Sequence, residues 1–201
     1  MKKNQKQRKI QRTNIIKMNR GETLLMLNNK IKTLNLVKHC LVCEAAMKGL
    51  AKYFKEDEEK WGLAGLLHDI DYEETKDKPE EHSLKGAQFL KGQGIDEDIT
   101  EAIKTHNERH GLSPQSKMAK SLFCVDPLTG LIVAATLVLP SKKIKEVTTD
   151  NVLNRFKEKG FARGANREII KQCELLLGLS LQQFVSLVLQ GMQSVADDIG
   201  L

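Results

Sequence analysis

Apolar residues recur every three to four positions along most of the chain, which is the spacing of amphipathic helices. No stretch shows the alternation of apolar and polar residues that is typical of strands. The pattern predicts an all-α fold, a bundle of about eight to ten helices. The expected helices span residues 21–33, 35–54, 57–70, 79–94, 96–107, 117–126, 127–140, 148–161, 166–178 and 180–200.

The ends of several segments carry residues that begin or end helices. Asn35 is a candidate N-cap, and the acids at the start of 57–70 suit the positive end of a helix dipole. Two glycines close the segment 79–94. Pro127 is tolerated as a first helical residue, so we expect one helix to end near Asp126 and the next to begin at Pro127.

Length and composition indicate one globular domain. The chain has 201 residues, of which 40% are apolar and 29% charged. The longest apolar stretch, 128–140, is too short to span a bilayer, and no signal peptide is apparent. We therefore expect a cytoplasmic protein with no membrane partner.

The net charge of +6 is unevenly distributed. Residues 1–20 carry eight basic side chains and no acid, so the remainder has a net charge of −2. We expect 1–20 to be a basic, disordered tail and 21–201 to be the folded domain, with Met18 or Met26 as alternative native starts. The tail is the only feature that favours nucleic acid, so we expect no nucleic-acid partner. Nothing indicates the oligomeric state.

The four cysteines form no disulfide framework, which suits a reducing compartment. Cys40 and Cys43 make a C-x-x-C motif within an apolar helical segment, without a second pair. We interpret them as core residues.

Histidines and one aspartate interrupt the apolar pattern. Four of the five histidines lie within or at the ends of predicted helices, whereas His110 lies in a loop, where we expect it to be solvated. Asp126 is flanked by apolar residues on both sides, and a buried carboxylate is costly unless it is paired or bound to a metal.

His68 and Asp69 are adjacent, and neighbouring helical residues point about 100° apart. They can flank a groove at a helix end, where ligands from other helices would complete an interior metal site. Imidazole and carboxylate without thiolate suit Mn, Fe, Co, Ni or Zn and argue against a closed structural zinc site. The further candidates are His39 upstream, and His82, His106 and Asp126 downstream.

Each histidine also has an ordinary structural interpretation. His68 and His106 could interact with the negative ends of helix dipoles. His39 could be a hydrogen-bonded core residue, and His82 could belong to the first turn of a helix. These alternatives stay open from the residues alone.

The order His39, then His68 and Asp69, then Asp126 resembles the H…HD…D signature of the HD-domain metal-dependent phosphohydrolase superfamily. "HDID" at 68–71 stands where many members have HDIG. The resemblance covers about residues 35–140.

This resemblance implies a metal bound by His39, His68, Asp69 and Asp126. Members with two ions add histidines in segments that here contain His82 and His106, and Asp69 would then bridge the ions. The implied activity is hydrolysis of a phosphate ester of a nucleotide or small phosphorylated metabolite by metal-bound hydroxide. Asp69 would orient the attacking water and accept its proton.

The chain departs from the branch that cleaves cyclic di-GMP. Asn107 stands where that branch has a second consecutive histidine, and "ERHGLSP" lacks the GYP tripeptide. Lys85, Lys104 and Arg109 are the basic residues nearest to the ligands and are candidates for substrate binding. Two other functions remain open: a regulatory or sensor HD module without turnover, and a di-iron oxygenase on the same scaffold.

Overall fold

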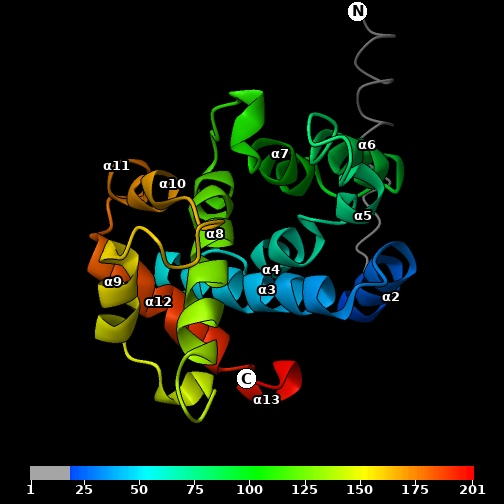
Figure 1. The fold of residues 1–201 in the computed structure, drawn as a ribbon. Helices are drawn as coiled ribbons and strands as arrows, with labels where there is room; N and C mark the ends of the chain where they lie inside the picture. Colours follow the sequence, from blue (N-terminus) through cyan, green and yellow to red (C-terminus); the bar gives the residue numbers. More distant parts are fainter. Residues whose placement is uncertain (1–18) are drawn as a thin grey trace, which may run out of the picture.

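The computed structural model describes residues 19–201, and the regular elements in that range are all helical (Figure 1). Eight of the described helices have nine residues or more, so the predicted all-α bundle is confirmed. The α-helices are α2 (Arg20–Lys30), α3 (Leu34–Phe54), α4 (Glu58–Leu67), α5 (Tyr72–Thr75), α6 (Leu84–Gly92), α7 (Glu97–Thr105), α8 (Lys117–Leu137), α9 (Thr149–Lys157), α10 (Arg167–Lys171), α11 (Cys173–Leu177), α12 (Leu181–Gln193) and α13 (Ala196–Ile199). Two 3₁₀ turns, η1 (Glu108–His110) and η2 (Ile144–Glu146), complete the set.

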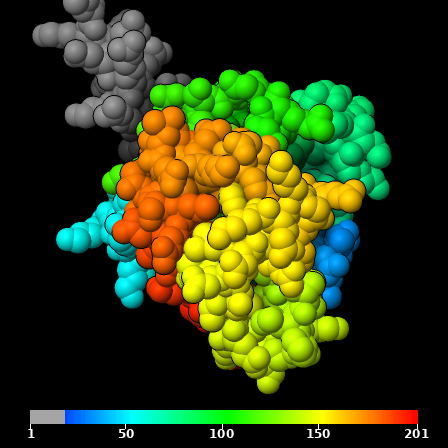
Figure 2. Space-filling view, turned by 60° about the vertical axis from the view of Figure 1, so that its left-hand side comes forward, coloured from blue at the N-terminus to red at the C-terminus, as the bar shows by residue number. Residues whose placement is uncertain are grey.

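The two 21-residue helices α3 and α8 form the centre of the fold. They cross each other (Figure 1), and α3 also packs against α4 and α12. Helix α8 contacts α7 on one side and α9 to α12 on the other, and Figure 2 shows the face where the segment of α9, α10 and α11 covers it. Met47 and Leu50 on α3, and Leu128 and Leu131 on α8, are completely buried.

Two glycines allow helices to approach α3 closely. A Cβ atom on Gly65 of α4 would lie 2.5 Å from the carbonyl oxygen of Cys43, and one on Gly191 of α12 would lie 2.6 Å from that of Ala45. A larger residue at either position would push the helices apart. The contact at Gly65 matters for function because it fixes the end of α4, where His68 and Asp69 follow.

The folded part begins slightly earlier than predicted. Asn19 caps α2 through a capping box with Glu22, and Arg20 is the first helical residue. The Arg20 guanidinium binds both oxygens of the buried Glu44 carboxylate, at 2.5 and 2.9 Å. The tail boundary at residue 20 is therefore wrong for Asn19 and Arg20, and the remaining tail, residues 1–18, lies outside the described residues.

Helix α8 is continuous, whereas the sequence predicted two helices that meet at Pro127. The proline lies inside the helix. It has no N–H to donate to the Phe123 carbonyl, so α8 lacks one backbone hydrogen bond at this point. The local proline signal is overridden because apolar residues on both sides, such as Leu122 and Leu128, are buried in the same core.

Other boundaries differ more modestly. The segment predicted as a helix over 79–94 becomes helical only at Leu84, because Ser83 has a left-handed backbone with φ of 71°. Helix α4 ends at Leu67 rather than at residue 70, so His68 and Asp69 lie in the turn that follows.

Helix α8 is long and apolar enough to span a membrane by length and composition, but 67% of its most apolar window is buried inside the protein. That burial is typical of a core helix.

Candidate metal centre

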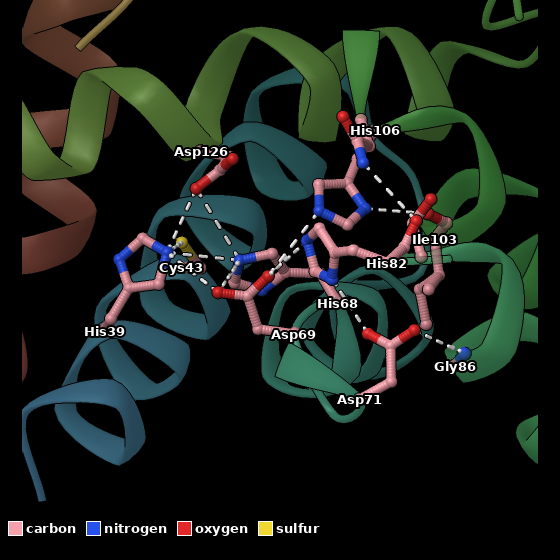
Figure 3. A network of polar contacts seen from close by, with 12 residues as sticks. His39, Cys43, His68, Asp69, Asp71, His82, Gly86, Ile103, His106 and Asp126 are labelled. Atoms are coloured by element: carbon pink, nitrogen blue, oxygen red, sulfur yellow. Dashed lines mark hydrogen bonds and ion pairs between the residues drawn. The ribbon is translucent and has the colours of Figure 1, made fainter. Parts of the chain in front are cut away.

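Four side chains from α3, from α8 and from the turn after α4 meet in the interior (Figure 3). His39 lies in the second turn of α3, His68 and Asp69 directly follow α4, and Asp126 lies near the middle of α8. His39 Nε2 is 3.0 Å from Asp126 Oδ1 and 3.1 Å from His68 Nε2. Asp69 Oδ2 is 3.4 Å from His68 Nε2 and 3.7 Å from His39 Nε2. The structure thus brings together the four residues of the H…HD…D pattern.

The other oxygen of Asp69 faces two further histidines. His82 precedes α6, and His106 directly follows α7. Asp69 Oδ1 is 3.3 Å from His82 Nε2 and 3.6 Å from His106 Nε2. One carboxylate therefore lies between two groups of imidazoles, each facing a different oxygen (Figure 3).

Hydrogen bonds fix the orientation of these rings. The Nδ1 atom of His68 lies 2.8 Å from the Gly65 carbonyl oxygen, and that of His106 lies 2.7 Å from the Ile103 carbonyl oxygen. A carbonyl can only accept, so Nδ1 donates in both rings. The neutral ring then keeps a lone pair on Nε2, the atom directed at Asp69. This tautomer is the one that metal ligation through Nε2 requires.

The metal-free cluster is strongly polarised. Burial raises the pKa of Asp69, but His68, His106 and His82 lower it more, and the net pKa lies well below the ordinary range. Burial lowers the pKa of His68, yet Asp69 and the other neighbouring groups raise it well above the ordinary value. Burial also lowers the pKa of His82, while hydrogen bonds to carboxylates raise it to about 9. Without metal, protons therefore supply the positive charge that balances the buried carboxylates.

The charge of the cluster is balanced by histidines alone. Among residues 19–201, Asp69 and Asp126 form ion pairs with imidazoles and with no lysine or arginine. Imidazole nitrogens and carboxylate oxygens that converge without a lysine or arginine are a donor set suited to divalent cations. The residues present therefore fit a metal site.

Cys43 lies closer to this site than the sequence indicated. Cys40 and Cys43 are completely buried in the core, as predicted. The Cys43 sulfur, however, is 3.9 Å from His39 Nε2 and 3.4 Å from the Thr129 hydroxyl oxygen. Cys43 is thus a core residue whose thiol also borders the ligand side chains. The i, i+4 spacing from His39 was the signal that could have identified it.

His110 is another residue whose role the sequence did not indicate. It is half-buried rather than solvated, and its Nε2 lies 2.7 Å from the backbone carbonyl oxygen of His82. Asn107 is buried and donates to the same carbonyl at 3.3 Å. Both residues therefore support the segment that carries His82.

A pocket of about 230 Å³ opens beside the cluster. One wall comes from the site and from α8, and the facing wall comes from the loop before α10 together with Ile169 of that helix. Its lining residues are His39, His106, Glu108, Phe123, Asp126, Pro127, Gly130, Gly164, Ala165, Asn166 and Ile169.

The loop wall of this pocket is held by one arginine. The Arg167 guanidinium donates to the carbonyl oxygens of Ala162 and Ala165, at 2.6 and 2.7 Å, and also to that of Phe161. Asn166 Nδ2 lies 3.4 Å from Glu108 Oε1 on the opposite side of the pocket. Arg167 thus fixes the loop on its own side of the pocket, and Asn166 contacts Glu108 on the other side.

The basic residues suggested for substrate binding do not line this pocket. Lys104 is half-buried, and Arg109 is exposed beside the lining residue Glu108. Lys85 pairs with Glu81 at 2.6 Å and with Glu74 at 3.4 Å.

A larger hollow of about 670 Å³ lies between α3 and α12, beside Glu44, Gly49 and Gly191. The groups of potential metal ligands found among the described residues all lie in the cluster around Asp69. The smaller pocket is therefore the one that belongs with the chemistry.

Comparison with known proteins agrees with this geometry. Residues 36–130 match the family model of the HD domain. The chain contains an HD domain. All six residues of the cluster lie within the matched HD segment, whereas Gly164, Ala165 and Asn166 of the pocket wall lie beyond it.

Curated relatives are similar to a larger part of the chain. Ribonuclease Y of Lawsonia intracellularis is 29% identical over 140 residues, which is 68% of this chain and 27% of the relative. Ribonuclease Y of Nitratidesulfovibrio vulgaris is 30% identical over 138 residues, 67% of this chain and 26% of the relative. The chain spans about a quarter of the length of these relatives. No solved structure gives a significant match.

Proposed function

We propose that this HD domain is a phosphohydrolase that uses two divalent metal ions to hydrolyse a small phosphate ester. The observation that carries the proposal is the position of Asp69, whose two oxygens face two separate groups of ligand side chains. A single-ion site would need only one of these groups.

The ligand side chains divide into two sets that share Asp69. His39, His68 and Asp126 would hold one ion together with Asp69 Oδ2. His82 and His106 would hold the other together with Asp69 Oδ1. Transition metals of the Mn, Fe, Co, Ni and Zn group suit these donors. Bound ions would neutralise phosphate charge and lower the pKa of a water molecule, which is the chemistry that hydrolysis requires.

Asp69 and Asp126 have different parts in this mechanism. Both oxygens of Asp69 face histidines, and its side chain is 9% exposed, so it orients the ligands and has no oxygen free to take a proton. Asp126 contacts the histidines through Oδ1, its side chain is 30% exposed, and it lines the pocket. We therefore assign proton transfer to Asp126 in place of the Asp69 role that the family resemblance implied.

The pocket favours a small substrate. A volume of about 230 Å³ is below the range of about 300–1,000 Å³ typical of sites for drug-sized ligands. Phe123, Pro127 and Ile169 offer apolar contact, while Glu108 and Asn166 offer polar contact. This lining supports a small phosphorylated metabolite or a mononucleotide rather than a polynucleotide strand.

A second candidate is cleavage of RNA, because the curated relatives are named ribonucleases. It requires the same two ion positions but a phosphodiester substrate.

For location, we propose a reducing compartment such as the cytoplasm. The four cysteines are free and buried, which suits a chain that forms no disulfides.

The test is metal content by plasma mass spectrometry, combined with hydrolysis assays. Wild-type protein, His82→Ala and the control Asp77→Asn would be purified without chelators and reconstituted with Mn²⁺. Asp77 is an exposed acid near the site in sequence and outside the cluster. We expect about two equivalents in wild type and control and about one in His82→Ala. Phosphomonoesters, phosphodiesters and a short RNA would then be offered to each protein.

The outcomes separate the candidate functions. Metal-dependent release of phosphate from monoesters supports the proposal, and cleavage restricted to RNA selects the second candidate. Two bound irons with oxygen consumption and no hydrolysis would indicate the oxygenase. An absence of metal binding after reconstitution would refute the enzyme and leave a sensor or binding module.

A further inference from the structure

His82 is held through both its backbone and its ring, and the residue that holds the ring belongs to this chain's own variant of the HDIG motif. Its backbone carbonyl accepts hydrogen bonds from His110 and Asn107, at 2.7 and 3.3 Å. Ser83 follows it with φ of 71° and ψ of −37°, a conformation that non-glycine residues rarely adopt. The buried Ser83 hydroxyl donates to the Lys104 carbonyl at 3.2 Å, which ties this turn to α7. Strained backbone of this kind persists where the surroundings fix a functional side chain.

The His82 ring itself is fixed by Asp71, the last residue of "HDID". Asp71 Oδ1 accepts from His82 Nδ1 at 2.9 Å, and Oδ2 accepts from the backbone N–H of Gly86 at 2.7 Å. Asp71 is only 4% exposed, so these two donors replace water for a buried carboxylate (Figure 3).

Gly86 makes the second contact possible. A Cβ atom at this position would lie 3.1 Å from Asp71 Cγ, closer than side chains normally pack. The glycine thus lets the first turn of α6 approach the carboxylate. The Asp71 carboxylate is thereby held between α6 and the His82 ring.

We infer that Asp71 is a positioning residue that directs His82 Nε2 toward Asp69 and so builds the second ion position. The inference rests on the proposed two-ion function. Asp71 has the place of the glycine of the HDIG motif, and a glycine has no side chain to hold a ligand histidine. With Nδ1 donating to Asp71, the neutral His82 ring presents its lone pair on Nε2, 3.3 Å from Asp69 Oδ1.

Both carboxylate oxygens are needed because both receive a donor. In Asp71→Asn, one oxygen becomes an NH₂ group. If that group faces His82, it forces Nδ1 to accept and moves the ring proton to Nε2, which then cannot bind metal. If it faces Gly86, two donors oppose each other. A nearly isosteric change therefore has a specific chemical effect.

The experiment is a calorimetric Mn²⁺ titration of the full metal-free chain. The proteins are wild type, Asp71→Asn, Asp71→Gly, His82→Ala, the double variant Asp71→Asn/His82→Ala and the control Asp77→Asn. Asp71→Gly creates HDIG in this chain and is compatible with the backbone φ of −101°. If the amide in Asp71→Asn disturbs the start of α6, Asp71→Gly serves as the second variant. Thermal unfolding of each metal-free protein establishes that it is folded.

In wild type and Asp77→Asn we expect two ions to bind. Both Asp71 variants should keep the first ion and bind the second about 10–100-fold more weakly, the usual effect of losing a residue that orients a ligand. The double variant should match His82→Ala, because Asp71 acts through His82.

Three results would overturn the inference. Unchanged affinity for two ions in both Asp71 variants would remove the role of Asp71 and leave the proposed function standing. Equal weakening of both ions would show that Asp71 supports the fold and not His82. Wild-type protein that binds fewer than two ions would refute the two-ion function and the inference together.

Discussion

Without metal, the stability of this protein should fall as the pH rises, because its buried histidines lose protons. In the metal-free site the pKa of His82 is raised to about 9, whereas an unfolded chain has a value near 6.5. The folded state therefore favours protonated His82. That contribution is fully present below about pH 6.5 and is lost as the pH rises through about 9.

The size of the effect follows from the shift. A difference of about 2.5 pKa units corresponds to about 3 kcal/mol, of which about 2 kcal/mol is lost between pH 6.5 and 8.5. The His82 side chain is only 14% exposed, so solvent screening reduces this value little. For a domain of this size, 2 kcal/mol lowers the thermal midpoint by about 4–8 °C. His39 and His68, whose pKa values are also raised, add to the fall.

Other titrating groups lie outside this window. The pKa values of Asp69 and Asp126 are lowered, so their contributions are present above their unfolded values and are lost only in acid. Burial raises the pKa of the Cys173 thiol to about 12. This thiol opposes folding only above about pH 8.5, where it ionises in the unfolded chain. The interval from pH 6.5 to 8.5 therefore reports on the histidines.

The assay is thermal unfolding, followed by circular dichroism, of chelator-treated protein at pH 6.5, 7.5 and 8.5. Wild type should lose stability across the series, and His82→Ala should lose less. Metal-loaded protein should not show the fall, because the bound ion replaces the proton. A metal-free midpoint that stays level or rises with pH, or an equal fall in His82→Ala, would refute the reasoning.

Three further substitutions test the framework of the site. Gly65→Ala places a Cβ atom 2.5 Å from the Cys43 carbonyl oxygen, so urea unfolding should show a loss of about 1–3 kcal/mol together with reduced metal content; unchanged stability would contradict the close helix contact. Arg167→Ala removes the donors that hold the pocket loop, so it should raise KM for a small phosphate ester while metal content stays at the wild-type level; an unchanged KM would exclude a role of the loop in substrate binding. Arg20→Ala leaves the buried Glu44 carboxylate without its main partner and should cost about 1–3 kcal/mol in the same urea assay, whereas no loss would mean that water or another cation compensates.

Much of the site could be predicted from the sequence because its residues break a helical pattern. Asp126 lies between long apolar runs, and a carboxylate there needs a partner. His39 and the pair His68 and Asp69 interrupt apolar segments in the same way. Their order resembles one family, and the helical fold follows from the apolar spacing alone.

The features that were missed depend on contacts between distant segments. Pro127 is a local signal for a helix start, and only the shared core of α8 overrides it. Ser83 has a positive φ and a hydrogen bond to α7, and a serine at this position is no local signal for such a backbone. Asp71 is one of several acids in the charged segment 71–81, and only the fold places it against His82 and Gly86.

The continuity of α8 limits where this chain can be cut into separately folding fragments. The match to the HD domain ends at residue 130, but the helix continues to Leu137, and Leu131 and Ile132 in that extension are completely buried. The same helix that carries Asp126 also contacts α9 to α12. A fragment cut at the family boundary would expose an apolar surface and lose one wall of the pocket. In this protein the HD segment is therefore not an interchangeable module, and an insertion is better tolerated in the loop between α8 and α9, where no core helix would be interrupted.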